Sequence, residues 1–338
     1  MIRRTLACAL LAPPLALACG GGDSPFDPTG TPFVVVEPPG AERTATNRSE
    51  ADETGAAEPE PPGDGELVSL EWLAGGDFPS VPSAFVSPVQ NAELRAAIQG
   101  ALAGQEGRFS VIVHNLADGR YASLKAGDTY YAASLFKAAV LLEAYRQRDS
   151  GELDFAKEVE VTKAAAENDL GTLEYLEIEI GDKVTIGDAV KAMIVVSDTT
   201  LGNLVLEEVG YSNVDDTLRE IGASTMTVSD TELPTTAADM AALVGAIARG
   251  DGVSEASRQE MLSLMAQEWF AEGVVAGLPA GTLYAHKTGS YTDATHDVAI
   301  VEGPAGPYLI AVLSDRSSEW EPIADVSAAV WQYFAENP

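Results

Sequence analysis

Ser134 and Lys137 are the residues whose types and spacing most directly suggest chemistry. They lie three residues apart in a segment that is otherwise apolar from Ala132 to Leu142. Residues at this spacing share one face of a helix, so the hydroxyl and the amine lie within reach of each other. A buried ammonium is costly unless it is paired, and desolvation beside a second cation lowers the pKa of an amine. The pair therefore predicts a nucleophilic serine activated by a lysine base; the alternative is a lysine that extends to solvent from the helix edge.

A second hydroxyl motif, Ser197-Asp198-Thr199, stands between two apolar segments. At a break between two buried helices, the hydroxyl of Ser197 can project into a cleft and pass a proton to a leaving group. The alternative is a helix cap, in which Ser197 or Asp198 accepts hydrogen bonds from amides of the following helix.

The third motif, His286-Lys287-Thr288-Gly289-Ser290, is predicted to lie at the end of a strand. Lys287 supplies positive charge for a carboxylate, Gly289 lets a substrate backbone approach closely, and the amide of Ser290 can face a developing oxyanion. The alternative is a strand end with a solvated lysine and a turn glycine. Each motif is weak by itself, and the strong signal is their combination in this order.

Strands at both ends of the folded part and helices between them are predicted to position these motifs. Asn91 is expected to cap a first helix. A hairpin follows, with strands over 109–115 and 120–125 joined by Asp118-Gly119. The helical period dominates 132–266, and the remaining elements are strands over 282–287, 295–301 and 308–313 and a helix over 322–334. This order indicates an α+β domain over residues 89–338.

The N-terminal segment has the features of an export signal. Arg3 and Arg4 precede an apolar run, and residues 1–18 are expected to be a signal peptide. The sequence around Cys19 resembles the lipobox of bacterial lipoproteins, which implies lipidation of Cys19 and a membrane anchor facing the periplasm or the cell exterior. The alternative is a plain signal peptide that is cut elsewhere. Residues 19–88 are expected to form a disordered linker, and this interpretation is favoured even for the apolar patches 33–36 and 67–70.

The charge balance excludes several classes of partner and site. The chain has 20 Lys and Arg against 52 Asp and Glu, a formal net charge of −32. Such a field repels polyanions, so no nucleic acid partner is expected. Three histidines without an H-E-x-x-H motif leave little for a zinc site, and we expect no metal and no cofactor. A Ser-His-Asp hydrolase would place its nucleophile in G-x-S-x-G, whereas Ser134 lacks both glycines.

Together the motifs resemble the S-x-x-K, S-D-N and K-T-G set of the penicillin-recognising serine hydrolases, and the chain is similar to the class A β-lactamases within that family. The resemblance covers residues from about 91 to the C-terminus. It implies a β-lactamase/transpeptidase-like α+β fold, with a five-stranded antiparallel sheet flanked by helices and a helical subdomain. For the site it implies the following roles: Ser134 as the acylated nucleophile, Lys137 as its proton acceptor, Ser197 as the proton shuttle to the leaving nitrogen, Lys287 and Thr288 as ligands of a substrate carboxylate, and the amides of Ser134 and Ser290, beside Gly289, as the oxyanion hole.

Two departures from the family pattern concern substrate contact and deacylation. Thr199 stands where the family has asparagine, so a shorter hydroxyl takes the place of a side-chain amide at this substrate-binding position. Between residues 218 and 235 there is no E-x-x-L-N, the omega-loop motif whose glutamate activates water in class A enzymes. Glu232 could substitute, but an exposed loop glutamate is the favoured interpretation. Acylation is therefore better supported than rapid turnover.

The expected protein is an exported, lipid-anchored, monomeric serine hydrolase with β-lactam hydrolysis as its leading activity. One alternative is a D-alanyl-D-alanine carboxypeptidase or an esterase of the same fold. Another is a penicillin-binding module with slow deacylation, or a degenerate domain that only binds cell-wall peptide. The expected partners are a small-molecule β-lactam or a cell-wall peptide, together with the membrane that holds the anchor.

Overall fold

The computed structural model describes residues 67–70 and 85–338. Its main sheet has the strand order β2-β4-β3-β11-β10-β9. All neighbours pair antiparallel except the short edge strand β2, which joins β4 in parallel. In this order the strands are β2 (Val89–Gln90), β4 (Arg120–Leu124), β3 (Phe109–Asn115), β11 (Gly306–Ser314), β10 (Ala294–Gly303) and β9 (Tyr284–Tyr291).

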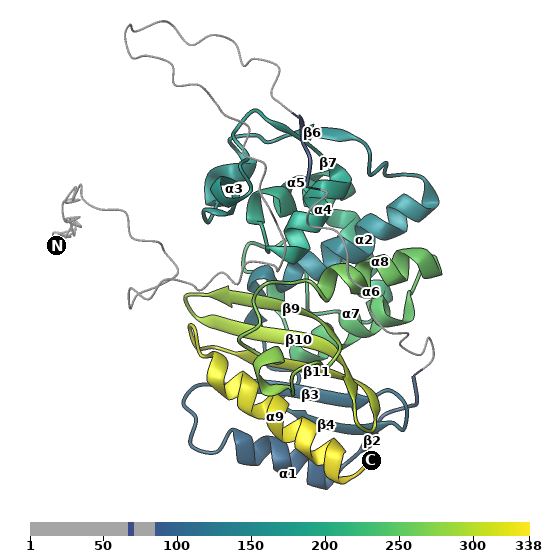
Figure 1. Ribbon diagram of the computed structural model, residues 1–338, viewed down its shortest axis with the longest axis vertical. Helices are drawn as coiled ribbons and strands as arrows, with labels where there is room; N and C mark the ends of the chain where they lie inside the picture. Colours follow the sequence, from purple (N-terminus) through teal and green to yellow (C-terminus); the bar gives the residue numbers. More distant parts are fainter. Residues whose placement is uncertain (1–66, 71–84) are drawn as a thin grey trace, which may run out of the picture. The chain divides into compact units, whose positions relative to one another are not determined.

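Helices cover both faces of this sheet (Figure 1). On one face lie α1 (Ala92–Ala101) and α9 (Trp320–Glu336), and on the other lies α7 (Ala237–Arg249). Side chains alternate along a strand, so Val111 and Val113 of β3 join the α1 and α9 side of the core while Ile112 joins the α7 side. Both faces of the central strands are therefore buried.

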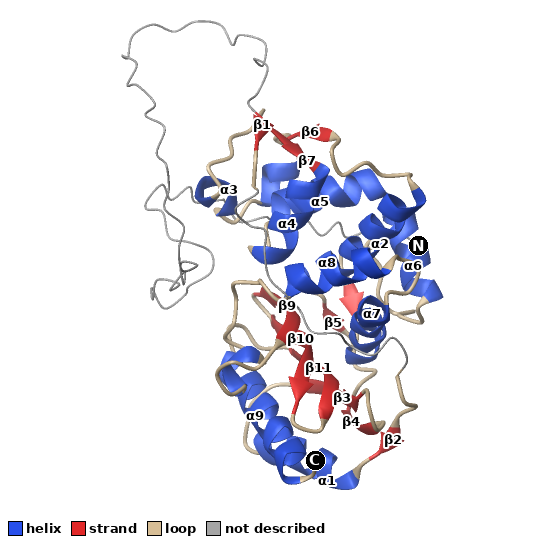
Figure 2. Cartoon of the chain, turned by 45° about the vertical axis from the view of Figure 1, so that its right-hand side comes forward, coloured by secondary structure: helices blue, strands red, loops and turns tan. Residues whose placement is uncertain are grey.

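A helical subdomain packs around α2 (Phe136–Ser150), as Figure 2 shows. Helix α2 is buried on all sides, since every residue from Phe136 to Tyr145 is buried. Its neighbours are α4 (Ile186–Val195), α5 (Thr199–Val209), α6 (Tyr211–Glu220) and α8 (Glu255–Met265). The short elements are α3 (Thr172–Tyr175), β6 (Glu158–Glu160), β7 (Lys183–Thr185), and the pair β5 (Tyr130–Tyr131) and β8 (Pro234–Thr235).

The predicted α+β fold is confirmed, with its five antiparallel strands extended by β2 at one edge. Asn91 caps α1 as expected, because its Oδ1 accepts a hydrogen bond from Leu94 N at 2.8 Å. One prediction is wrong in position: the K-T-G motif lies inside β9, not at a strand end. The strand continues because residues up to Tyr291 keep their pairing with β10.

The expectation of a disordered linker is wrong at residues 67–70. Here β1 (Leu67–Val68) pairs in parallel with β7, and Leu70 is fully buried in the core around α2. Burial of one leucine is worth about 1.5–3 kcal/mol, which together with the β1–β7 pairing favours this position of the segment on the domain. Phe85 also packs against the core, so the folded part already includes residues 85–88. The predicted signal peptide, Cys19 and the patch 33–36 lie outside the described residues.

In the part of the chain that the structure describes, none of the helices combines the length and the apolar character needed to cross a membrane.

Candidate active site

Ser134 lies in η2 (Ala133–Leu135), a single 3-10 turn that leads directly into α2. The preceding residue, Ala133, has a φ of 47°, a left-handed backbone conformation that residues other than glycine rarely adopt. This turn places Ser134 at the start of the buried helix while leaving it partly exposed. Lys137, one turn further on, is fully buried, and its Nζ lies 3.1 Å from Ser134 Oγ. The predicted serine–lysine pair is thus formed, and Lys137 does not extend to solvent.

Oxygen atoms of two further residues surround the Lys137 amine. Its Nζ lies 2.5 Å from the carbonyl oxygen of Ser197, 3.4 Å from Ser197 Oγ and 3.2 Å from Thr199 Oγ1. Among the described residues, no carboxylate pairs with this amine. Burial, followed by the positive charge of Lys287, lowers the pKa of Lys137 to about 7. A lysine with this pKa can accept a proton near neutral pH.

The rate of Ser134 acylation is expected to rise with pH and to level off above an apparent pKa of about 7. Below this value Lys137 is an ammonium and cannot accept the serine proton; above it the neutral amine predominates. The measurement is the pseudo-first-order acylation rate of the protein between about pH 5 and about pH 9, under conditions where the acylation step limits the observed rate. A rate that is flat across this range would contradict the assignment of Lys137 as the base.

Ser197 occupies the break between α4 and α5, as predicted, and its φ of 56° turns the chain sharply there. Its Oγ lies between the two lysines of the site, 3.4 Å from Lys137 Nζ and 3.1 Å from Lys287 Nζ. The cap of α5 is Asp198, whose Oδ1 accepts from Leu201 N at 2.6 Å. The capping interpretation therefore applies to Asp198, and the Ser197 hydroxyl remains directed at the site.

Glu268 is the residue of the site that sequence reasoning missed. It follows α8 in an irregular segment and is buried against the K-T-G motif. Its Oε1 forms an ion pair with Lys287 Nζ and accepts from Thr288 Oγ1 at 2.6 Å. Its Oε2 accepts from the Thr288 amide at 2.9 Å. The signal that could have led to it is Lys287 itself, because a lysine inside a buried strand needs a counter-ion.

Gly289 brings β9 into close contact with the turn that carries Ser134. A Cβ atom at this position would lie 2.9 Å from the Ala132 carbonyl oxygen and 3.3 Å from Leu135 N. Only glycine permits this approach. Ser290 follows directly and pairs with Thr295 of β10. The predicted oxyanion-hole residues therefore come from two elements that meet at Gly289.

The two histidines near the site, His286 on β9 and His296 on β10, are fully buried. His296 Nε2 lies 2.8 Å from the Tyr131 carbonyl oxygen, and burial lowers the pKa of His296 to about 4. His286 Nδ1 lies 3.1 Å from Asp297 Oδ1. Burial alone would lower the pKa of His286, but the charge of Asp297 and this hydrogen bond raise it above the usual value. His296 thus contacts a backbone carbonyl group and His286 a carboxylate. Within residues 67–70 and 85–338, no group of His, Cys, Asp and Glu side chains is arranged to hold a metal ion.

Glu232 lies exposed in the loop before β8, as favoured from the sequence. The loop approaches the Ser134 turn through its backbone, where the Ala132 amide donates to the Leu233 carbonyl oxygen at 2.8 Å. Within the described residues, no carboxylate accepts a hydrogen bond from Ser134. Tyr175 packs edge-on against Trp269, with ring centroids 5.1 Å apart.

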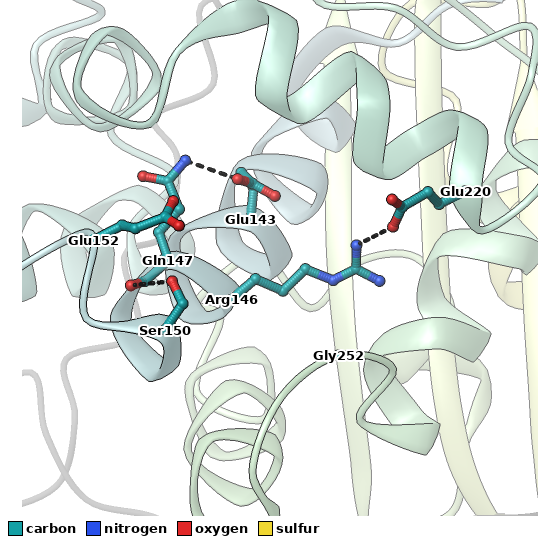
Figure 3. Close-up of a pocket in the computed structure, with 7 residues that line it drawn as sticks. All are labelled: Glu143, Arg146, Gln147, Ser150, Glu152, Glu220 and Gly252. Carbon is teal, nitrogen blue, oxygen red and sulfur yellow. Dashed lines mark hydrogen bonds and ion pairs between the residues drawn. The ribbon is translucent and has the colours of Figure 1, made fainter.

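A surface cavity of about 320 Å³ lies at the opposite, C-terminal part of α2 (Figure 3). It contains the ion pair between Arg146 and Glu220, whose charged atoms are 2.9 Å apart. None of the motif residues lines it. The cavity is therefore separate from the cluster around Ser134. Its lining residues are Glu143, Arg146, Gln147, Ser150, Glu152, Glu220 and Gly252.

Comparisons with known proteins find a matching family and similar folds. A family model described as the beta-lactamase enzyme family matches residues 93–334. Beta-lactamase FAR-1 of Nocardia farcinica is 28% identical over 228 residues, which cover 62% of this chain and 71% of that protein. The solved structure of PBP-A has a similar fold, with a TM-score of 0.69 at 23% identity over 75% of this chain and 100% of that one. The ancestral class A beta-lactamase GNCA is similar with a TM-score of 0.64 at 25% identity, over 71% and 100% of the two chains.

The family match spans the whole region that carries the three motifs and the sheet that positions them. The serine, the two lysines and the second serine predicted from those motifs converge on one site. The chain therefore belongs to the beta-lactamase enzyme family, as a class A β-lactamase-like member.

Proposed function

We propose that this protein is a serine hydrolase that opens β-lactam rings by forming an acyl-enzyme on Ser134, and that water attack on this acyl-enzyme is its slow step. The observation that carries the proposal is the 3.1 Å separation of Ser134 Oγ from a fully buried Lys137 amine. The lowered pKa of that amine, about 7, fits a base that takes the serine proton.

In the proposed acylation, the neutral amine of Lys137 accepts the proton of Ser134 as the serine oxygen bonds to the lactam carbonyl carbon. The amides of Ser134 and Ser290 would hold the oxyanion. The carbon–nitrogen bond then breaks, and Ser197 passes its proton to the leaving nitrogen. Ser197 recovers a proton from the Lys137 ammonium, 3.4 Å away. The step ends with an ester on Ser134 and a neutral Lys137.

Slow deacylation is proposed because the described site offers no obvious group to activate water. No carboxylate contacts Ser134 or Lys137, Glu232 is exposed, and Glu268 is engaged by Lys287 and Thr288. Loss of a general base costs about 10²- to 10⁴-fold in rate. This observation favours a second candidate, a penicillin-binding or carboxypeptidase-like protein that retains the drug. A variant of PBP-A, whose fold this chain shares, has been solved as an acyl-enzyme with penicillin G.

The test is intact-protein mass spectrometry of the full chain mixed with penicillin G and sampled over time. We expect a covalent adduct in the wild type and none in Ser134→Ala. Ser150→Ala, at the far end of α2, is the matched control and should form the adduct at the wild-type rate. An adduct that clears as hydrolysed drug accumulates supports a β-lactamase, and one that persists supports the second candidate. An adduct that also forms in Ser134→Ala would refute the assignment of the nucleophile.

We further propose that the protein works as an exported monomer, lipid-anchored through Cys19 and facing the periplasm or the cell exterior. The proposal rests on the signal-like residues 1–18 and the small residues before Cys19. Its ligand would be a small-molecule β-lactam or a cell-wall peptide. Mass spectrometry of the membrane-extracted protein would reveal acyl chains on an N-terminal Cys19, whereas a mature chain that begins elsewhere would contradict the anchor.

A further inference from the structure

Lys287 has no hydrogen-bond donor left for an incoming substrate. An ammonium group carries three N–H donors. The Nζ of Lys287 contacts Glu268 Oε1, Ser197 Oγ at 3.1 Å and the Thr288 carbonyl oxygen at 3.0 Å. These three acceptors use its full donor capacity. The lysine predicted to attract a carboxylate is thus already fully engaged within the chain.

Thr288 is engaged by the same carboxylate. Its hydroxyl donates to Glu268 Oε1 at 2.6 Å, and its amide donates to Glu268 Oε2 at 2.9 Å. One ammonium, one hydroxyl and one amide therefore converge on a single carboxylate, an arrangement suited to an anion. Exposures of 5% for Glu268, 4% for Thr288 and 0% for Lys287 show that solvent does not share these contacts.

The backbone next to Glu268 is attached to helix α4. The amide of Trp269 donates to the carbonyl oxygen of Val195, at the end of α4, at 3.0 Å. Behind the carboxylate, His286 Nε2 lies 4.0 Å from Glu268 Oε2. His286 is itself hydrogen-bonded to Asp297, so the side chain of Glu268 lies among other buried ionisable groups.

We propose that Glu268 is a specificity-determining residue that fills the carboxylate-binding position of the site, so that the site favours acyl donors that are uncharged beside the scissile bond. This inference rests on the proposed acylation of Ser134 and names its substrate class. A carboxylate on the substrate would meet donors that are already occupied and the negative charge of Glu268. A neutral ester or amide at the same position escapes this repulsion.

The net charge of the protein acts in the same direction. A formal charge of −32 disfavours the approach of anions from solution. The two effects differ in range, because the overall field is screened by salt whereas a buried charge in contact with the ligand is screened much less. The contribution of Glu268 should therefore persist at high ionic strength.

The experiment compares penicillin G with its methyl ester, a matched pair that differs in one negative charge. Acylation of the full chain by each form is followed by mass spectrometry at high salt, and the rate ratio of acid to ester is compared between proteins. We expect the wild type to react faster with the ester. In Glu268→Gln the acid-to-ester rate ratio should be about 100-fold higher, or more, than in the wild type, as expected for removal of one buried repulsive charge.

Glu272→Gln is the control, because Glu272 lies four residues further along the same segment, is exposed, and interacts electrostatically with Asp297, Glu268 and His286 without contacting Lys287 or Thr288. Its ratio should equal that of the wild type. Glu268→Ala supplies a second variant if Glu268→Gln does not fold. The acid-to-ester rate ratio of the wild type tests the inference without any variant. This inference alone is overturned if the wild type reacts with the acid as fast as with the ester and the Glu268 variants give the same acid-to-ester rate ratio. If neither form acylates the wild type, the proposed function falls and this inference with it.

Discussion

Lys137→Met is expected to slow the acylation of Ser134 by about 10²- to 10⁴-fold, the usual contribution of a general base. The same change should stabilise the fold at about pH 6, because methionine carries no charge for burial to penalise. The measurements are the acylation rate with penicillin G and the free energy of unfolding in urea.

The gain in stability should depend on pH in a defined direction. The pKa of Lys137 is lowered from 10.5 to about 7 on folding, so the folded state penalises the ammonium. This penalty is fully present below about pH 7 and shrinks as the pH rises towards the pKa of the unfolded chain. The stabilisation by Lys137→Met should therefore be larger at about pH 6 than at about pH 9.

The exposed Lys163 supplies the control, because Lys163→Met should change the stability by less than about 0.5 kcal/mol. A Lys137→Met protein that is less stable than the wild type at low pH would show that the ammonium is satisfied in the folded state. Undiminished acylation in this variant would remove Lys137 from the mechanism.

Gly289→Ala is expected to lower the acylation rate by about 10²- to 10³-fold, the usual loss when one oxyanion donor is displaced. The added Cβ would lie 2.9 Å from the Ala132 carbonyl oxygen and 3.0 Å from Leu135 Cγ, and backbone cannot yield there as a flexible side chain would. Either β9 or the Ser134 turn must shift, which separates the two halves of the oxyanion hole. Overpacking of this kind also costs about 1–3 kcal/mol of stability.

The matched substitution is Gly100→Ala, where a Cβ meets nothing within 4 Å on helix α1. It should leave acylation unchanged and raise stability by up to about 1 kcal/mol, because alanine favours a helix over glycine. Acylation by Gly289→Ala at the wild-type rate, with the fold intact, would show that the close approach of β9 to the Ser134 turn is dispensable.

The sequence was sufficient to predict the parts of the site that depend on local spacing. Ser134 and Lys137 meet because three residues make nearly one helical turn, and Ser197 is available because two apolar segments must break between them. The strands over 109–115 and 308–313 were also predictable, since both carry long buried runs. Local rules of this kind need no knowledge of the tertiary fold.

Glu268 and the segment 67–70 could not be predicted from local rules. Glu268 lies 19 residues before Lys287 in an irregular segment, and only the packing of α8 against β9 brings the two together. Leu70 follows a strand of two residues, which is too short to show a period. Its burial depends on β7, more than a hundred residues away in the sequence. In both cases a tertiary partner decides the structure.

The left-handed backbone at Ala133 and Ser197 limits which substitutions can stabilise this protein without loss of acylation. Non-glycine residues in this conformation each cost about 1–3 kcal/mol, and both lie within the acylation site. Substitutions that relax this backbone would be selected wherever stability alone is rewarded, and they would move Ser134 or the Ser197 hydroxyl away from Lys137. Stabilising changes compatible with acylation must therefore come from elsewhere, for example from the layer formed by α1 and α9, which touches none of these residues.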